Sequence, residues 1–305
     1  CRLLAPKDFP QRNESPIMYP NLYSSGELTF HSYTVMMTLA FLIGTIGPIW
    51  LNRRREHPFR ATPVGGIWIF LGGILGAKIW WVVQYGDWGD VRYLQFILNG
   101  GLVFFGGLTG GMITAIIYLK ILRIPIITGA DMIAPFFALA HGIGRIGCFL
   151  NGCCWGALTK YPYPWSVRYP KGTGPFSRHL RQKLITSDAT CSLPIHPVQL
   201  YETFGNVVIF IILLLIYKKH KRTGVVTLSY FMLYGGLRFI TEMFRGESNR
   251  PVFGWLTASQ TVALGMFIFG VTAYLLCSMT LWKRALPDQE TEPAPDASAE
   301  ESPAE

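Results

Sequence analysis

Long apolar stretches alternate with short polar segments over most of this chain. A helix needs about 20 mainly apolar residues to cross the hydrocarbon core of a bilayer. Seven stretches approach or exceed that length, at 33–51, 64–85, 102–122, 126–150, 198–217, 225–244 and 255–282. The pattern therefore predicts an all-α, polytopic membrane protein with about seven transmembrane helices.

Composition supports lipid as the solvent of these helices. Half of the 305 residues are hydrophobic, only 15% are charged, and the mean hydropathy is +0.30, unlike an ordinary water-soluble domain. The third and fourth stretches are interrupted by glycine and proline, as between Gly100 and Gly111. Lipid tolerates irregular backbone only where a neighbouring helix or a cavity satisfies its polar groups. We interpret these interruptions as a sign of a cavity.

Lysine and arginine occur in alternate loops, which predicts an orientation because positive loops are retained in the cytoplasm. These basic residues lie at or after the ends of the first, third, fifth and seventh stretches. They are Arg53, Arg54, Arg55, Arg60, Lys120, Arg123, Lys218, Lys219, Lys221, Arg222, Lys283 and Arg284. The N-terminus is therefore expected outside and the C-terminus in the cytoplasm. The formal net charge of +9 then reflects topology and attraction to anionic lipids, and no nucleic-acid partner is expected.

The same pattern divides the chain into a membrane domain over 30–285 and polar flanking segments. Residues 1–29 are expected to form an extracytoplasmic N-terminal segment. Residues 152–196 are too numerous and too polar for a hairpin, so they predict a small extracytoplasmic head inserted into the membrane domain. Residues 286–305, rich in Pro, Glu, Ala and Ser, predict a disordered cytoplasmic tail.

Ionisable side chains inside the apolar stretches are functional candidates, because lipid tolerates them only when they face a bundle interior or water. They are Lys78, Asp131, His141, Arg145, Glu202, Arg238 and Glu242, with Tyr33, Tyr201 and Tyr234 nearby in sequence. Tyr234, Arg238 and Glu242 recur every four residues, so they share one helical face that should turn inward. Arg245 extends this stripe. A purely structural pair of Arg238 with Glu242 is the alternative.

Segment 141–156 combines glycines with polar residues that suit a phosphate. Arg145 can offer a bidentate fork to an anionic oxygen pair, and Asn151 can add amide hydrogen bonds. Glycines such as Gly147 and Gly152 would let the backbone approach a ligand. Tight helix packing through small residues is the alternative for the glycines.

The same segment contains Cys148, Cys153 and Cys154, so a metal site must be considered. Their spacing is not that of a C-x-x-C knuckle and no second pair follows, so no metal is expected. Cys191 in the predicted head could instead form a disulfide with Cys153 or Cys154, because that compartment is often oxidising. The sequence leaves the state of these cysteines open.

A third polar segment opens the fifth stretch. Pro197 suits the first turn of a helix, which places its neighbours at or just within the outer mouth of the bundle. These neighbours are His196, Gln199, Tyr201 and Glu202. A lone histidine at a helix start is usually a cap or a surface residue, but this one stands among other polar candidates.

Three of these segments, taken in order, resemble the prolipoprotein diacylglyceryl transferase family over roughly 30–282. Segment 144–156 (GRIGCFLNGCCWG) is similar to the family pattern G-R-x-G-N-F-x-N-x-E-x-x-G. Segment 196–202 (HPVQLYE) is similar to H-P-x-Q-L-Y-E, and 234–245 (YGGLRFITEMFR) to Y-x-x-x-R-F-x-x-E-x-x-R. Tyr33 stands where the family has an important tyrosine, and Lys78 where a basic residue, usually arginine, is expected.

The resemblance implies a multi-pass enzyme of the bacterial inner membrane. Such an enzyme transfers the diacylglyceryl group of phosphatidylglycerol to the thiol of the lipobox cysteine of a prolipoprotein, forming a thioether and releasing glycerol phosphate. The implied partners are phosphatidylglycerol, prolipoprotein signal peptides and membrane lipids, without a soluble cofactor.

The resemblance and the chemistry of the side chains together suggest roles. Arg145 and Arg238 would hold the leaving phosphate, because a guanidinium stays charged in a low-dielectric cavity. Glu202 and Glu242 would orient the arginines or accept a proton. Tyr33 and Tyr234 would form hydrogen bonds with the head group of the lipid. The other expected substrate-binding residues are Lys78, Gly147, Asn151, Gly152, His196, Gln199, Tyr201 and Arg245.

Three departures from the family pattern leave alternatives open. Phe105 stands where the family has histidine in F-H-G-G-L, and Cys148 and Cys153 replace the asparagine and glutamate of the first pattern. Glu202, or the cationic field, is expected to substitute for that histidine in activating the thiol. The alternatives are a catalytically inactive or different-acceptor relative that binds lipid, and a membrane transporter. A transporter predicts a repeat between the two halves, which the sequence does not show.

Overall fold

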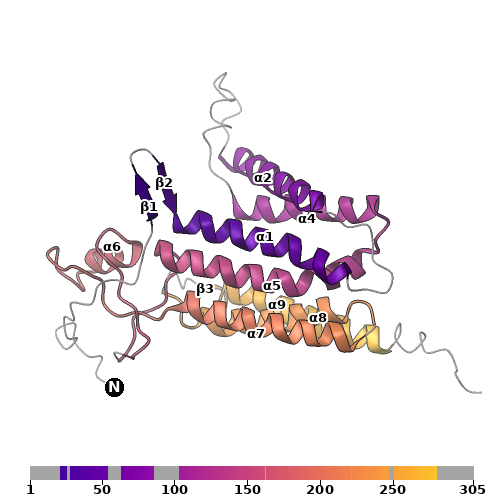
Figure 1. Ribbon diagram of the computed structural model, residues 1–305. Helices are drawn as coiled ribbons and strands as arrows, with labels where there is room; N and C mark the ends of the chain where they lie inside the picture. Colours follow the sequence, from indigo (N-terminus) through magenta and orange to yellow (C-terminus); the bar gives the residue numbers. More distant parts are fainter. Residues whose placement is uncertain are drawn as a thin grey trace, which may run out of the picture.

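The computed structural model describes residues 21–25, 28–53, 63–85, 103–161, 163–220, 222–246 and 251–279. Within these ranges the seven apolar stretches form helices whose ends lie within a few residues of the predicted ones (Figure 1). They are α1 (Ser32–Arg53), α2 (Val64–Tyr85), α4 (Phe104–Ile121), α5 (Ile126–Asn151), α7 (Val198–Lys219), α8 (Val225–Glu242) and α9 (Ala258–Met279).

Five of the helices in the described ranges are long and apolar enough to cross a membrane: α1, α2, α5, α7 and α9. Helix α4 is apolar but shorter, and α8 carries Arg238 and Glu242 within its 18 residues. The chain is therefore a polytopic, helical membrane protein. The larger count of seven spans stays a prediction.

In the described part of the chain, two short antiparallel strand pairs precede helices, and the hydrophobic pattern did not predict them. Strands β1 (Asn21–Ser25) and β2 (Leu28–His31) lead into α1. Strands β3 (Pro251–Phe253) and β4 (Leu256–Thr257) lead into α9. The predicted N-terminal segment and cytoplasmic tail lie mostly or wholly outside the described residues, as do the basic loop 54–62 and the loop 86–102.

Helix α5 lies at the centre of the bundle. It packs on α1 on one side and on α7 and α8 on the other, while α9 covers α8 (Figure 1). The core shared by α5, α7 and α8 is apolar and consists of Ala134, Ala138, Ile209, Leu213, Val226 and Tyr230. These three helices are therefore held at fixed rotations about their axes, which determines where their polar residues meet.

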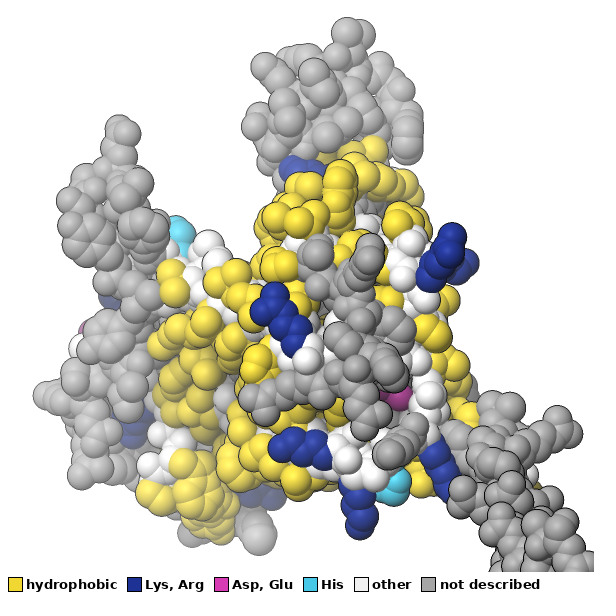
Figure 2. Space-filling model, turned by 45° about the vertical axis from the view of Figure 1, so that its right-hand side comes forward, with side chains coloured by type: hydrophobic (Ala, Val, Ile, Leu, Met, Phe, Trp, Pro, Cys, Tyr) yellow, Lys and Arg dark blue, Asp and Glu magenta, His cyan; other side chains and the backbone are white. Residues whose placement is uncertain are grey.

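Apolar side chains also cover much of the outer surface (Figure 2). Leu75 and Val83 of α2 are 62% and 63% exposed, and Val262 of α9 is 64% exposed. Monomeric water-soluble proteins rarely expose contiguous apolar surface on this scale. The exposed faces therefore fit a lipid environment.

Helices α2 and α4 form a separate pair beside α1, and glycines bring their backbones together. A Cβ added to Gly76 would lie 2.4 Å from the carbonyl oxygen of Gly106 and 2.8 Å from the Cα of Gly110. Small residues at such contacts allow close packing where lipid supplies little hydrophobic driving force. The glycines of α4 were interpreted as a sign of a cavity, and this interpretation is wrong for the described ones, because they allow close contact with the backbone of α2. Gly100 and Gly101 lie outside the described residues.

Segment 152–196 forms a small folded unit between the end of α5 and the start of α7. It contains the short helix α6 (Gly174–Arg181) and irregular backbone joined by isolated strand-like pairings such as Val167 with Ile195. Tyr169 and Ile195 are fully buried and pack on Phe149 at the end of α5. The predicted inserted head is thus a compact unit attached to this end of the bundle.

Substituting a glycine at the α2–α4 contact should destabilise the protein. Gly76→Ala places a Cβ against α4 backbone that cannot move without separating the helices, at an expected cost of about 1–3 kcal/mol. Gly265→Ala in α9 is the matched control, because a Cβ there meets nothing within 4 Å. Thermal unfolding in one detergent should show a lower midpoint for Gly76→Ala alone. Equal midpoints for both variants would contradict the close contact.

The head should lose stability in mild acid because of His179. This side chain is 4% exposed, and its Nδ1 accepts a hydrogen bond of 3.2 Å from the Leu193 N–H. Burial, reinforced by Arg178, lowers the pKa of His179 from 6.5 to about 4. The unfolded chain then binds more protons than the folded one between these values, so stability falls as pH decreases from 6.5 towards 4.

The expected loss from His179 is on the order of 2–3 kcal/mol, measured as a falling unfolding midpoint between pH 7 and pH 4.5. His179→Asn retains an acceptor that does not titrate, so it should flatten this dependence. His220→Asn, at an exposed position after α7, serves as the control. An identical pH dependence in the parent and in His179→Asn would disprove the assignment.

Candidate functional site

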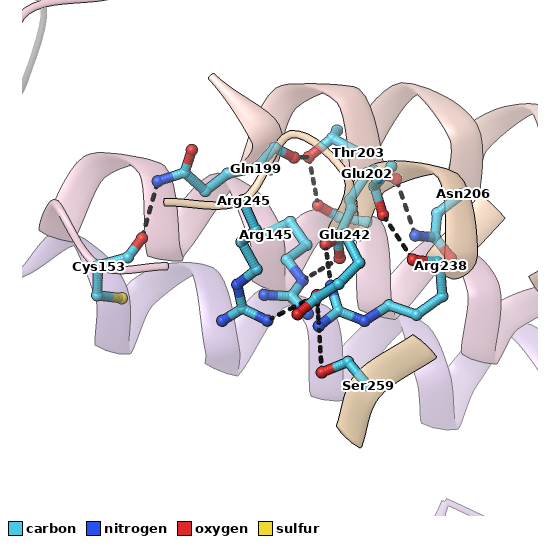
Figure 3. Close-up of polar contacts among 12 residues, drawn as sticks. Arg145, Cys153, Gln199, Glu202, Thr203, Asn206, Arg238, Glu242, Arg245 and Ser259 are labelled. Atoms are coloured by element: carbon cyan, nitrogen blue, oxygen red, sulfur yellow. Dashed lines mark hydrogen bonds and ion pairs between the residues drawn. The ribbon is translucent and has the colours of Figure 1, made fainter. Parts of the chain in front are cut away.

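Five charged side chains meet where α5, α7 and α8 pack together (Figure 3). Arg145 comes from α5, Glu202 from α7, and Arg238 and Glu242 from α8, with Arg245 just beyond the end of α8. We call these five residues the charge cluster. The sequence predicted every member as a candidate, and the structure brings all five together.

Glu202 is the shared partner of two arginines from different helices. Its Oε2 lies 2.7 Å from Nε of Arg145, and its Oε1 accepts a 2.5 Å hydrogen bond from Arg238. The Glu202 side chain is only 3% exposed. Both carboxylate oxygens are therefore occupied by guanidinium groups, which fixes the arginines relative to each other.

Glu242 extends the network on the other side of Arg238. Its Oε2 lies 2.8 Å from a second terminal nitrogen of Arg238 and 3.4 Å from Arg245. That Arg238 nitrogen also donates to Oγ of Ser259 in α9, at 3.2 Å. The expected pair of Arg238 with Glu242 exists, but it belongs to a network that joins four helices rather than standing alone.

The charges of the cluster do not cancel. Three guanidinium groups face two carboxylates, which leaves one excess positive charge. The arginine side chains are 11–18% exposed and the carboxylates 3–6% exposed, so the positive groups are the accessible ones. A guanidinium presents five N–H donors, more than the observed contacts use. The cluster is therefore suited to binding an anion, and a phosphate fits its donors.

The cluster lies close to the end of the bundle that carries the head. Arg145 stands six residues before the end of α5 at Asn151, and Glu202 four residues after the start of α7 at Val198. At 1.5 Å per residue, these positions are about 6–9 Å inside the helix ends. An anion arriving from this end would need to enter only about two helical turns.

An indentation reaches the cluster from the head. A pocket of about 230 Å³ lies between the segment around Trp155, helix α6 and Arg245. Arg178 and His179 of α6 line the pocket, together with Gln182 just after that helix. Arg245 thus belongs both to the charge cluster and to this pocket, so a molecule in the pocket can contact the cluster.

Aromatic side chains surround the start of α7. Nδ1 of His196 lies 3.2 Å from the hydroxyl of Tyr201, and both rings pack edge-on against Phe244. Tyr163 packs against His196 and stacks on Trp165 with ring centroids 5.2 Å apart. Partial burial lowers the pKa of His196, which favours its neutral form near pH 7. The helix begins at Val198 after Pro197, as the sequence predicted.

Gln199 connects α7 to the head. It is 1% exposed, and its Nε2 donates to the carbonyl oxygen of Cys153 at 2.8 Å and to the hydroxyl of Tyr169 at 2.9 Å. These contacts give Gln199 a positioning role in the structure. Its expected contact with substrate stays a prediction.

The two glycines expected to approach a ligand have structural surroundings. Gly147 faces α1, where a Cβ would lie 3.0 Å from Cβ of Met36 and 3.5 Å from Tyr33. Gly152 ends α5 in the left-handed region with φ +71°. Helix packing and chain reversal account for both glycines in this structure, and a direct contact with ligand stays a prediction.

The remaining expected residues lie at different distances from the cluster. Tyr234 stacks on Tyr230 and packs against His141 of α5, with ring centroids 5.1 Å apart. Tyr33 of α1 lies beside Gly147 at the α1–α5 contact. Asn151 is exposed at the end of α5. Lys78 is half-buried in α2, which packs mainly on α4 and contributes none of the five cluster residues.

Asp131 has a structural explanation. Its carboxylate accepts hydrogen bonds from the N–H groups of Gly224 and Thr227 and from the Thr227 hydroxyl, at 2.5–2.8 Å. It therefore caps the start of α8 from the neighbouring helix, where a negative charge is favourable. Conversely, Ser259 contacts Arg238 but escaped the sequence analysis, because a neutral hydroxyl in an apolar helix gives no distinctive signal.

The structure gathers three cysteines that the sequence left unassigned. The Sγ atoms of Cys148, Cys153 and Cys154 all lie within 4.8 Å of one another. These three, together with Cys191 and Cys277, are free thiols among the described residues. The spacing along the chain had suggested no metal site, whereas the fold places three sulfur atoms in one group.

Comparison with known proteins identifies the family. The family model described as prolipoprotein diacylglyceryl transferase matches residues 20–276. A phosphatidylglycerol–prolipoprotein diacylglyceryl transferase from Proteus mirabilis (strain HI4320) is 32% identical over 278 residues, covering 84% of this chain and 90% of the relative. The protein of the same name from Clostridium tetani (strain Massachusetts / E88) is 30% identical over 267 residues, covering 84% and 99%. Matches of this extent show that the chain belongs to the prolipoprotein diacylglyceryl transferase family.

Proposed function

We propose that this protein transfers the diacylglyceryl group of phosphatidylglycerol to the lipobox cysteine of prolipoproteins, forming a thioether and releasing glycerol phosphate. The observation that carries the proposal is the buried charge cluster, in which arginines outnumber carboxylates and are the more accessible groups. The names of the relatives supply the substrates and the reaction type.

The cluster suits the leaving group of this reaction. The acceptor sulfur attacks the terminal glyceryl carbon, and negative charge accumulates on the phosphate that departs. Arg145 and Arg238 are held in place before substrate arrives, through the ion pairs of Glu202 with both arginines and of Glu242 with Arg238. Donors fixed in advance stabilise developing charge most strongly where water is scarce. We assign Arg145 and Arg238 to the phosphate and the two glutamates to holding them.

The same geometry supports an orientation of the chain in the membrane. Arg53, Lys120, Lys218 and Lys219 lie in the last turns of α1, α4 and α7. Helix α5 meets the head at its C-terminal end and α7 at its N-terminal end, and the charge cluster lies beside these two ends. With the basic ends in the cytoplasm, the cluster, the head and the N-terminus lie on the outer side, and seven helices span the membrane. Lipid and a signal-peptide helix would then reach the cluster from within the bilayer.

The position of Phe105 bears on the choice between an active and an inactive relative. Its side chain is 66% exposed on α4, and α4 contributes none of the charge-cluster residues. The cluster is therefore complete without this position. The cluster has one guanidinium group more than its carboxylates can neutralise, which holding the helices together does not require, so we favour the active enzyme.

Removing either central arginine should abolish most of the transfer. We expect Arg145→Ala and Arg238→Ala to lower kcat/KM by about 10²–10³-fold, because each removes preorganised donors for the phosphate. The assay is transfer of labelled diacylglyceryl from phosphatidylglycerol to a lipobox peptide by purified protein in lipid. Arg181→Ala, at an exposed position in the head, should retain parental activity. A folded, lipid-binding parent without transfer would favour the inactive or different-acceptor alternatives.

Glu202→Gln separates positioning from proton transfer. It keeps the shape of the side chain but removes the charge shared by two arginines, so we expect a loss of more than about tenfold in kcat and lower stability by about 3 kcal/mol. Residual activity should retain the pH profile of the parent, and Glu202→Asp should recover part of the rate. A pH profile that loses one limb in Glu202→Gln would instead identify Glu202 as the proton acceptor, and full activity would remove it from both roles.

A further inference from the structure

Three cysteines converge beside the charge cluster. Cys148 lies in the last turn of α5, and Gly152 then reverses the chain with φ +71°. Cys153 and Cys154 consequently fold back onto Cys148, and the three Sγ atoms lie within 4.8 Å of one another. All three side chains are half-buried, so the group is shielded but reachable.

The backbone holds this arrangement firmly. The Cys153 N–H donates to the Cys148 carbonyl at 3.1 Å, and the buried Gln199 amide donates to the Cys153 carbonyl at 2.8 Å. Cys154 adopts a φ of +57°, a conformation that costs a residue other than glycine about 1 kcal/mol or more. The hydrogen bonds hold Cys153, and the positive φ of the next residue turns the Cys154 side chain towards the same place.

We infer that Cys148, Cys153 and Cys154 bind one zinc ion through their sulfur atoms and leave its fourth position for the thiol of the acceptor. The choice of acceptor thiol rests on the proposed function, whereas the binding of zinc does not. The family pattern compared with segment 144–156 above has asparagine in place of Cys148 and glutamate in place of Cys153, so the site would be a property of this chain and of others with the same cysteines.

The geometry and the ligand chemistry fit zinc. Tetrahedral zinc with Zn–S bonds of about 2.3 Å places its sulfur atoms about 3.8 Å apart, which small side-chain rotations can reach from the observed separations. Soft thiolate ligands favour zinc over the oxygen-seeking cations. The thiolates would also find positive charge nearby, since Arg145 lies three residues before Cys148 on the same face of α5.

An open fourth position would address the chemical demand of the transfer. A thiol that coordinates zinc is deprotonated, so its proton passes to solvent as it binds. The sulfur electron pair then forms the C–S bond to the terminal glyceryl carbon. The C–O bond to phosphorus-bound oxygen breaks, and its electron pair leaves with the glycerol phosphate. One helical turn of α5 separates Arg145 from Cys148, which places the phosphate-binding group close to the sulfur site.

Metal binding can be tested without any activity assay. Purified, reduced protein in detergent is titrated with Co²⁺ as a spectroscopic probe for zinc, and metal content is measured after Zn²⁺ loading and gel filtration. We expect one metal per chain, with the thiolate-to-cobalt charge-transfer bands of a tetrahedral sulfur site. Cys148→Ser, Cys153→Ser and Cys154→Ser should each weaken binding by at least about tenfold, whereas Cys277→Ser in α9 should not.

Absence of stoichiometric metal in the reduced parent would overturn the inference. So would unchanged cobalt spectra in the three serine variants, or a disulfide within the group in protein isolated without reductant. Transfer activity separates the two proposals. Activity that survives both chelation and the serine substitutions would leave the transferase standing without the acceptor-binding zinc. Bound zinc in a protein without transfer would leave the metal site standing without the transferase.

Discussion

The structure depends on a carboxylate that two helices must share. Lipid cannot solvate an isolated charge, so the arginines of α5 and α8 can remain inside the bundle only beside a fixed counter-charge. Glu202 of α7 supplies that charge to both, at 2.7 Å and 2.5 Å. Removing one partner from a buried pair typically costs about 3–5 kcal/mol, a large part of the stability of most proteins. The rotations of α5, α7 and α8 are therefore tied to one side chain.

Close packing elsewhere supports this arrangement without contributing to the chemistry. A Cβ at Gly142 of α5 would lie 3.2 Å from Cβ of Asn206 in α7, and one at Gly147 would lie 3.0 Å from Cβ of Met36 in α1. Asp131 of the neighbouring helix α5 holds the first turn of α8. Close packing at Gly142 and Gly147 and the Asp131 cap at the start of α8 therefore help to fix how α5, α7 and α8 pack against one another.

Much of this arrangement could be predicted from the sequence, because it follows from periodicity. The helices were visible as apolar stretches, and the four-residue spacing of Tyr234, Arg238 and Glu242 identified the inward face of α8. Which helices touch was not encoded in that pattern. The prediction of a cavity at the α4 glycines failed because hydropathy cannot distinguish a gap from a neighbouring backbone, here that of Gly76.

The cysteines show the same limit on a smaller scale. Their spacing along the chain is not that of a C-x-x-C knuckle, yet a left-handed residue at Gly152 and another at Cys154 bring three sulfur atoms together. The spacing of residues along the chain predicts how close they lie in space only where the backbone between them is regular. Asp131 is the converse case, an ionisable residue in an apolar stretch whose partners, Gly224 and Thr227, lie more than 90 residues away in the chain.

The insertion of the head between α5 and α7 has a consequence for how this enzyme can diversify. The residues that would hold phosphate lie on the helices, whereas the polypeptide that enters and leaves the head is anchored near Cys153 and Gln199. Loops, helix α6 and surface charges between those anchors can change in length or sequence while the charged helices keep their positions. Selection on the protein clients of a given bacterium could therefore act on the part of the head beyond Cys154 separately from selection on the lipid reaction.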